Sequence, residues 1–175
     1  MSAEPCSTCP KARRKTYRRR QKGFSLIELL IVVAIVLILA AIAIPSFMRS
    51  RIAANEASAV SSLRLLNTSE VTYHSTYNIG YTCARAALGP PSSGNPTSAA
   101  AGIIDVSLAS GQKSGYTFAP GTCITVSGSV TRYQWSADPA LSTTGTRHFC
   151  TDESFLIKVD PNSASNCFTI GSPIG

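Results

Sequence analysis

An unbroken apolar segment near the amino terminus dominates the hydrophobic pattern of this chain. Residues 24–44 hold 21 positions with one charged side chain, Glu28, and Pro45 follows directly. At about 1.5 Å per residue, a helix of this length crosses the roughly 30 Å hydrocarbon core of a bilayer. A secretory signal peptide has a shorter apolar core, of about 7–15 residues. The pattern therefore predicts a transmembrane helix over 24–45.

The helical pattern continues beyond the apolar segment, because no Pro or Gly interrupts it as far as Tyr77. At about 100° per residue, one stripe of this predicted stalk, residues 46–78, is apolar or aromatic and suits a covering sheet. Its members are Ile52, Ala59, Leu63, Leu66, Tyr73 and Tyr77. The opposite face carries small side chains that let neighbouring helices approach closely. These are Ala54, Ser61, Thr68 and Thr72. We expect Arg49, Arg51 and Glu56 to form a solvated or intersubunit charge cluster.

Residues 79–175 have the pattern of a small head. Gly and Pro residues from Gly80 to Pro96 predict a loop-rich connection. Ala99–Ser110 is predicted as a short helix, with Ser98 as its N-cap and Gly111 at its end. Strand-like runs follow at Tyr116–Phe118, Cys123–Ser127, Thr131–Ala137, His148–Cys150 and Phe155–Val159, with a hairpin tip at Ser127-Gly128-Ser129. The predicted fold is α+β, a long amino-terminal helix packed on an antiparallel sheet of three to five strands.

Composition and charge argue against one class of function, nucleic-acid binding, and predict the orientation of the membrane helix. Apolar residues make up 44% of the chain and the net charge is +7. Residues 1–23 carry eight Lys and Arg against Glu4, so this leader accounts for the whole excess, and the remaining eight basic and eight acidic residues cancel. The body therefore lacks the basic surface of a nucleic-acid-binding protein. A basic leader before an apolar helix predicts that residues 1–23 stay in the cytoplasm.

Glu28 is the anomaly of the apolar segment. A carboxylate inside a membrane helix costs roughly 2.5–3.5 kcal/mol and usually has a designated partner. The segment contains no cation. An α-amino group at Phe24 would supply one if the chain were cut after Gly23.

The run Lys22-Gly23-Phe24-Ser25-Leu26-Ile27-Glu28-Leu29-Leu30-Ile31-Val32-Val33-Ala34-Ile35 resembles the leader and signature of type IV prepilins. The resemblance implies cleavage between Gly23 and Phe24 by a prepilin peptidase that also N-methylates Phe24. It further implies polymerisation through the apolar helix, with Glu28 paired to the terminal amine of a neighbouring subunit. The equivalent of Pro45 in the family lies where the helix kinks or locally melts in filaments.

Four cysteines follow the predicted cleavage point, Cys83, Cys123, Cys150 and Cys167. An even number in a translocated domain predicts two disulfides, with three possible connectivities. Guided by the resemblance, we favour Cys83–Cys123 and Cys150–Cys167, the second closing a loop of the kind found at pilin carboxy termini. In the leader, Cys6 and Cys9 form a CxxC pair without the further ligands that zinc needs.

Two clusters of polar residues in the head could suggest catalysis or metal binding, but neither matches the sequence pattern of such a site. His148, Asp152 and Ser154 lie on one predicted hairpin without a nucleophile elbow, so we expect no catalytic triad. Asp152, Glu153 and Asp160 offer oxygen ligands for calcium, which secretion pseudopilins bind in this region, but no loop pattern matches closely. We expect no enzyme activity, no metal and no cofactor.

We therefore expect a structural subunit of a type IV pilus, an inner-membrane precursor that matures into a surface filament. Its expected partners are other copies of itself, the membrane, the prepilin peptidase and methyltransferase, and an assembly machinery with its ATPase and inner-membrane platform. A type II secretion pseudopilin is the nearest alternative, although two disulfides favour a surface fibre. A minor adhesive tip pilin and a signal-anchored periplasmic enzyme or binding protein are further alternatives, and Glu28 argues against the last.

Overall fold

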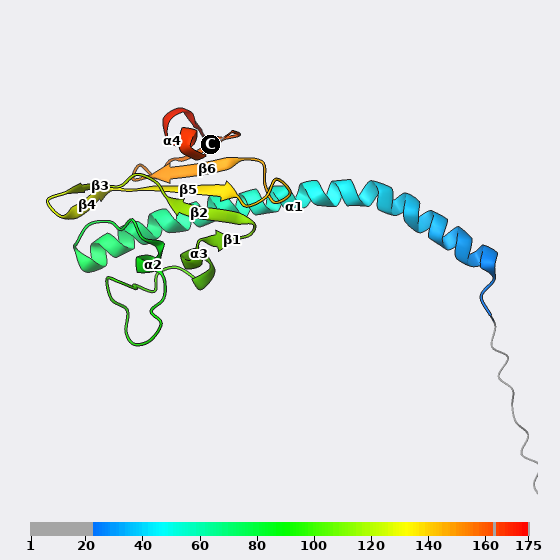
Figure 1. Cartoon of the computed structure of the whole chain (residues 1–175), viewed down its shortest axis with the longest axis horizontal. Helices are drawn as coiled ribbons and strands as arrows, with labels where there is room; N and C mark the ends of the chain where they lie inside the picture. Colours follow the sequence, from blue (N-terminus) through cyan, green and yellow to red (C-terminus); the bar gives the residue numbers. More distant parts are fainter. Residues whose placement is uncertain (1–22, 163, 175) are drawn as a thin grey trace, which may run out of the picture. The chain divides into compact units, whose positions relative to one another are not determined.

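The computed structural model describes residues 23–162 and 164–174 (Figure 1). One helix, α1 (Leu26–Tyr77), forms most of the amino-terminal half of these residues. The chain divides into two compact units, Met1–Ala41 and Ile42–Gly175. The leader, with Cys6 and Cys9, lies outside the described residues. A long amino-terminal helix and an antiparallel sheet confirm the predicted α+β, pilin-like fold.

In the second unit, α1 buries the predicted stripe. Ala59, Leu63, Leu66 and Tyr73 are buried and belong to one hydrophobic core with the aromatic residues of the sheet. The small residues of the opposite face, Ala54, Ser61, Thr68 and Thr72, are exposed. The stripe and the small-residue face are thus both where the helical periodicity predicts them.

The head is built on a six-stranded antiparallel sheet in the order β1-β2-β5-β6-β7-β8. Its strands are β1 (Gln112–Lys113), β2 (Tyr116–Pro120), β5 (Gln134–Pro139), β6 (His148–Asp152), β7 (Ile157–Asp160) and β8 (Ser172–Pro173). The expected three to five strands were too few, because the edge strands β1 and β8 have two residues each and leave no alternating pattern in the sequence. Figure 1 shows the sheet alongside the carboxy-terminal part of α1.

A separate hairpin, β3 (Ile124–Val126) with β4 (Ser129–Arg132), extends from the main sheet. Its tip has positive φ angles at Ser127 and Gly128, as a tight two-residue hairpin turn requires. The prediction of one strand over Thr131–Ala137 was wrong. Tyr133, fully buried, separates β4 from β5 where the chain passes from the hairpin into the main sheet.

Three short helices complete the head, α2 (Arg85–Leu88), α3 (Val106–Ser110) and α4 (Ala164–Ile170). The predicted helix over Ala99–Ser110 was too long. Its first part is not helical, because the Ala101 and Ile103 amides donate to the carbonyls of Ala87 and Leu88, both at 2.8 Å. The helix begins only after Asp105, whose carboxylate accepts the Leu108 amide as an N-cap.

Candidate processing and assembly site

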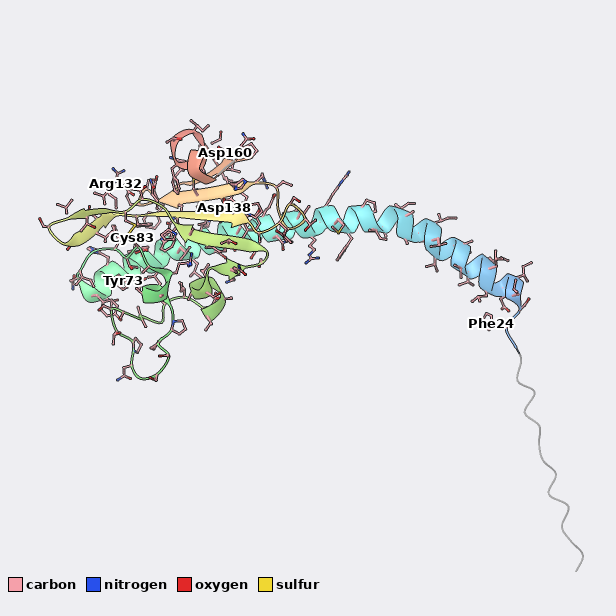
Figure 2. The ribbon with its side chains drawn as sticks, viewed as in Figure 1. Phe24, Tyr73, Cys83, Arg132, Asp138 and Asp160 are labelled. Carbon is pink, nitrogen blue, oxygen red and sulfur yellow. A yellow bond between two sulfur atoms is a disulfide. The ribbon has the colours of Figure 1, made fainter. Side chains whose placement is uncertain are left out.

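The predicted cleavage junction lies in an exposed, non-helical segment before α1. Gly23 and Phe24 are both exposed, and 76% of the Phe24 surface is accessible (Figure 2). A Cβ added to Gly23 would meet no atom within 4 Å. The first helical hydrogen bond joins the Leu29 amide to the Ser25 carbonyl at 3.2 Å. The backbone at the predicted bond is therefore open on its described side.

The apolar part of α1 exposes its side chains to the surroundings. Among the described residues, α1 is the one helix long and apolar enough to cross a membrane, with a mean hydropathy of 3.2 in its most apolar window. None of that window is buried within the chain. Soluble monomers rarely expose so large a contiguous apolar surface, so lipid or other helices must cover it.

One side of this apolar part forms a seam of side chains separated by single helical turns. The seam is lined by Leu26, Leu29, Leu30, Val33, Ala34 and Leu37. Residues at this spacing share one helix face, and the small side chain at Ala34 leaves room for a neighbouring helix. The seam is suited to packing another helix along it.

Glu28 lies on the other side of α1 from this seam. At about 100° per residue it is displaced by roughly 200° from Leu26. Its side chain is exposed, and it forms no ion pair with any residue in 23–162 or 164–174. A carboxylate on an apolar helix that has no ion-pair partner among the described residues points to a partner outside them.

Pro45 lies inside α1 rather than after it. Proline has no amide hydrogen, so the carbonyl of Ala41, four residues earlier, loses its helical hydrogen bond. The boundary between the two compact units falls directly after Ala41. The weakened turn therefore coincides with the division of the chain.

A second set of contacts joins α1 to the head through polar residues that the sequence did not mark. Glu56 is buried and accepts hydrogen bonds from Arg147 at 2.6 and 2.8 Å and from the Thr146 amide and hydroxyl at 3.1 Å. Burial of the carboxylate opposes its ionisation, but the hydrogen bonds and the charge of Arg147 outweigh burial and lower the pKa of Glu56. The prediction of a charge cluster with Arg49 and Arg51 was therefore wrong for Glu56.

Glu70 is fully buried and has no cationic partner within the described residues. The Trp135 indole donates to its Oε1 at 3.1 Å, and the Thr82 amide to its Oε2 at 2.8 Å. Burial raises the pKa of Glu70 to about 7, although both hydrogen bonds oppose the shift. One turn earlier, Asn67 donates to Thr151 at 2.7 Å and accepts from Tyr133 at 3.2 Å. These contacts fix α1 against β5 and β6.

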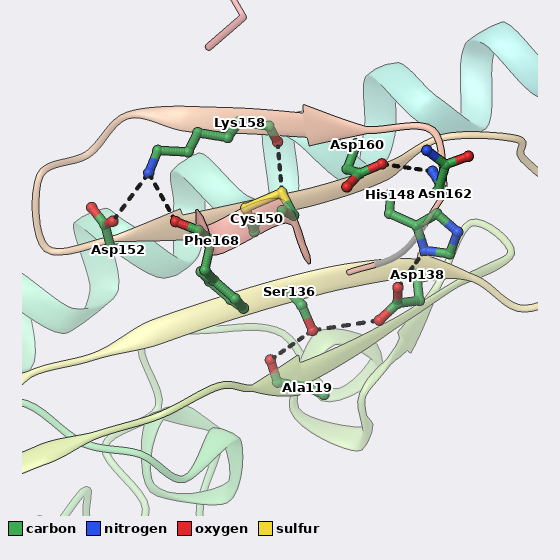
Figure 3. Close-up of a disulfide and its surroundings, with 11 residues drawn as sticks. Ala119, Ser136, Asp138, His148, Cys150, Asp152, Lys158, Asp160, Asn162 and Phe168 are labelled. Carbon is green, nitrogen blue, oxygen red and sulfur yellow. Dashed lines mark hydrogen bonds and ion pairs between the residues drawn. A yellow bond between two sulfur atoms is a disulfide. The ribbon is translucent and has the colours of Figure 1, made fainter. Parts of the chain in front are cut away.

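Both disulfides of the structure lie in the head, joining Cys83 to Cys123 and Cys150 to Cys167. They are the pairs that the resemblance favours. Cys83–Cys123 ties the segment after α1 to the start of the β3–β4 hairpin. Cys150–Cys167 holds α4 against β6 on the sheet face away from α1 (Figure 3).

The residues that suggested catalysis do not make the contacts of a triad. His148 Nδ1 lies 2.5 Å from Asp138 Oδ1, not from Asp152 (Figure 3). Asp152 instead accepts from the Ser154 amide at 3.0 Å and from the Ser154 hydroxyl. Ser154 therefore donates to a carboxylate and not to the ring of His148, which pairs with a different aspartate, so these contacts do not make a triad.

The three candidate calcium ligands also diverge. Asp152 accepts a hydrogen bond from the Ser154 amide. Glu153 forms an ion pair with Arg132 on β4. Asp160 accepts a hydrogen bond from the Asn162 amide at 2.7 Å. Across the described part of the chain, no group of three or more His, Cys, Asp or Glu residues is arranged to hold a metal ion.

Comparison with known proteins bears on the amino-terminal segment. Residues 18–44 match the family model described as the prokaryotic N-terminal methylation motif. A stretch of 59 residues is 44% identical to the type IV major pilin protein PilA of Myxococcus xanthus. This match covers 34% of the chain and 27% of that relative, so the chain spans about a quarter of its length. No solved structure matches the chain significantly.

The motif and the fold define a class of protein, a methylation-motif helix joined to an antiparallel-sheet head. The resemblance to type IV prepilins seen in the sequence is confirmed by the matched methylation motif and by the similarity to a type IV major pilin, and the fold is pilin-like. The matched family points to a structural protein rather than an enzyme. Gly23, Phe24 and Glu28 all lie within the matched residues.

Proposed function

We propose that this chain is a structural subunit of a type IV pilus. The observation that carries the proposal is the exposed Gly23-Phe24 junction at the start of an apolar segment, residues 24–44, whose single charge is Glu28. The precursor inserts in the inner membrane with residues 1–23 in the cytoplasm, because these residues carry a net charge of +7. A prepilin peptidase then cuts after Gly23 and N-methylates Phe24.

Cleavage creates a cation for Glu28, which has no ion-pair partner among the described residues. The new amino group of Phe24 is positively charged near neutral pH. In the filament it pairs with Glu28 of a neighbouring subunit, in apolar surroundings where an ion pair is stronger than in water. A subunit docked out of register leaves this carboxylate unpaired at a cost of several kcal/mol, so the pair selects one axial register.

The two sides of the helix contact different neighbouring subunits in the filament. The apolar seam from Leu26 to Leu37 packs against one neighbouring helix, while Glu28 faces another on the opposite side. Self-association is thus the main interaction of the mature chain. The ATPase, the inner-membrane platform and the peptidase supply the chemistry and the force.

A pseudopilin of a type II secretion system is the second candidate, because it uses the same helix and junction. Two disulfides in the head favour the pilus, since a fibre outside the cell gains from covalent cross-links. The named relative is a major pilin. Surface fibres support the pilus, and a filament confined to the periplasm supports the pseudopilin.

The processing step is tested by replacing Gly23 with leucine. The G23L chain should accumulate at full length in the membrane fraction, while the wild type is shortened by its first 23 residues. Extraction at alkaline pH is the control, because both chains should resist it if insertion is unaffected. Normal shortening of G23L would refute the proposed cleavage site.

A further inference from the structure

Ion pairing within the described residues leaves a distinctive set of charges without partners. Five pairs use most of the charged side chains, namely Lys113–Asp105, Arg132–Glu153, Arg147–Glu56, His148–Asp138 and Lys158–Asp152. In residues 23–162 and 164–174, the exposed cations outside these pairs are Arg49, Arg51 and Arg64, all on α1.

Two of these arginines lie just beyond the apolar segment. Arg49 is five residues past Ile44, about 7.5 Å along the helix axis, and Arg51 is about 10 Å past it. The headgroup layer on each side of a bilayer is about 5–8 Å thick, and long arginine side chains reach back toward it. Between the apolar segment and these arginines, Phe47 exposes 68% of its surface, as aromatic residues do at membrane interfaces.

A second copy of the chain offers few unpaired carboxylates to which these arginines could bind. The carboxylates outside ion pairs in the described residues are Glu28, Glu70 and Asp160, and the last two are buried. Glu28 is committed to the Phe24 amine in the proposed filament. The acceptor for Arg49 and Arg51 is therefore an anion that the subunit itself does not supply.

The orientation of the precursor makes this pair of charges unexpected. Positive residues are disfavoured on the translocated side of a membrane helix, where the proposed topology puts Arg49 and Arg51. Guanidinium groups form paired hydrogen bonds with phosphate oxygens, and cations beside a membrane helix are attracted to anionic lipids.

We propose that Arg49 and Arg51 bind the phosphates of anionic lipid headgroups on the outer face of the inner membrane while the subunit waits for assembly. The two side chains are about 200° apart around the helix, so they contact different lipids rather than form one pocket. The contacts hold the unassembled subunit at a fixed depth. Extraction into the filament exchanges them for water. This inference rests on the membrane insertion given under Proposed function.

The test uses the full-length chain in phosphatidylcholine vesicles that contain a trace of photoactivatable lipid. One probe carries its diazirine in a phosphatidylglycerol headgroup, and the other in a phosphatidylcholine headgroup. After chymotryptic cleavage behind Phe47, mass spectrometry measures label on the fragment that begins at Met48. Label on the basic leader falls on other fragments and does not interfere.

The wild-type fragment should favour the phosphatidylglycerol probe, and the double variant R49Q/R51Q should lose that preference by roughly fivefold for each arginine removed. The matched control is R64Q, because Arg64 is about 30 Å past Ile44 and beyond the headgroups. R64Q should keep the wild-type preference. Equal labelling of the wild-type fragment by both probes, or an equal loss in R64Q, would overturn the proposal.

A third probe, with the diazirine in the acyl chain, separates this inference from the proposed function. Acyl-chain label on residues 24–44 together with no headgroup preference would refute the arginine contacts alone. Absence of acyl-chain label would refute the membrane insertion on which both proposals rest.

Discussion

The indole of Trp135 on β5 donates a hydrogen bond to the fully buried carboxylate of Glu70 on α1, at 3.1 Å. The two residues are 65 positions apart in the chain, and the contact joins the stalk to the centre of the head. Trp135 is the chain's single tryptophan, so its fluorescence reports directly on this junction.

Glu70 should make the head less stable as the pH rises from about 4.5 to about 7. Burial raises its folded pKa to about 7 from 4.5, so the folded state binds a proton that the unfolded state releases over this interval. The loss is on the order of 3 kcal/mol, complete near pH 7. Denaturant unfolding of the detergent-solubilised chain, followed by Trp135 fluorescence, should show a shallower pH dependence in E70Q. E153Q, at a surface ion pair, is the control, and an unchanged slope in E70Q would contradict the assignment.

Removing Arg147 should destabilise the head more than removing an exposed arginine. R147M leaves the buried Glu56 carboxylate without its cation, at an expected cost of roughly 2–4 kcal/mol, reduced because Arg147 is half exposed. R132M removes the surface pair with Glu153 and should cost less than about 1 kcal/mol. The comparison is made by denaturant unfolding at pH 7. Similar losses of unfolding free energy in the two variants would show that the Arg147–Glu56 pair stabilises the head no more than a surface ion pair does.

The disulfide that closes the longer loop should contribute somewhat more to the stability of the head. The separations are 40 residues for Cys83–Cys123 and 17 for Cys150–Cys167. Loop-closure entropy gives about 4 and about 3 kcal/mol respectively. Paired Cys→Ser variants, C83S/C123S and C150S/C167S, test this by unfolding under oxidising conditions. Unchanged midpoints in both variants would mean that the cysteines are not bonded in the folded protein.

Replacing Glu28 with alanine should separate processing from assembly. The E28A chain keeps the Gly23-Phe24 junction, so its leader should still be removed. Fibre yield should fall steeply, since the Phe24 amine of each subunit then lacks its counter-charge. E28D, which keeps the charge on a shorter side chain, should recover part of the yield. Wild-type fibre yield from E28A, measured by shearing and electron microscopy, would remove the pairing argument.

The amino-terminal half of the fold was predictable because its signals are local. The apolar segment, the basic leader and the absence of helix breakers before Tyr77 all lie in consecutive sequence. The buried stripe follows from helical periodicity alone. The proposed processing residues Gly23 and Phe24 come from the resemblance to a short motif, which requires no knowledge of the head.

The stalk–head contacts were missed because their partners are distant in sequence. Glu56 pairs with Arg147, a residue 91 positions away, so its partner cannot be identified from its neighbours in the chain. A signal was nevertheless present. Glu56, Leu63, Glu70 and Tyr77 recur every seven residues, so both carboxylates stand on the stripe that the apolar residues define. A charged residue on a predicted core stripe indicates a specific buried partner rather than solvent.

The head was harder to predict because short strands carry little pattern. The two-residue strands β1 and β8 exist only through their neighbours. The non-helical path of Ala99–Ile104 likewise depends on backbone partners near Leu88, not on its own helix-favouring composition.

The most direct test of the account is the mass of this chain in filaments sheared from the cell surface. We predict a polypeptide that begins at Phe24, carries one added methyl group on its amino terminus, and retains two disulfides. Recovery of a chain that still bears residues 1–23, or surface filaments that never contain it, would contradict the account.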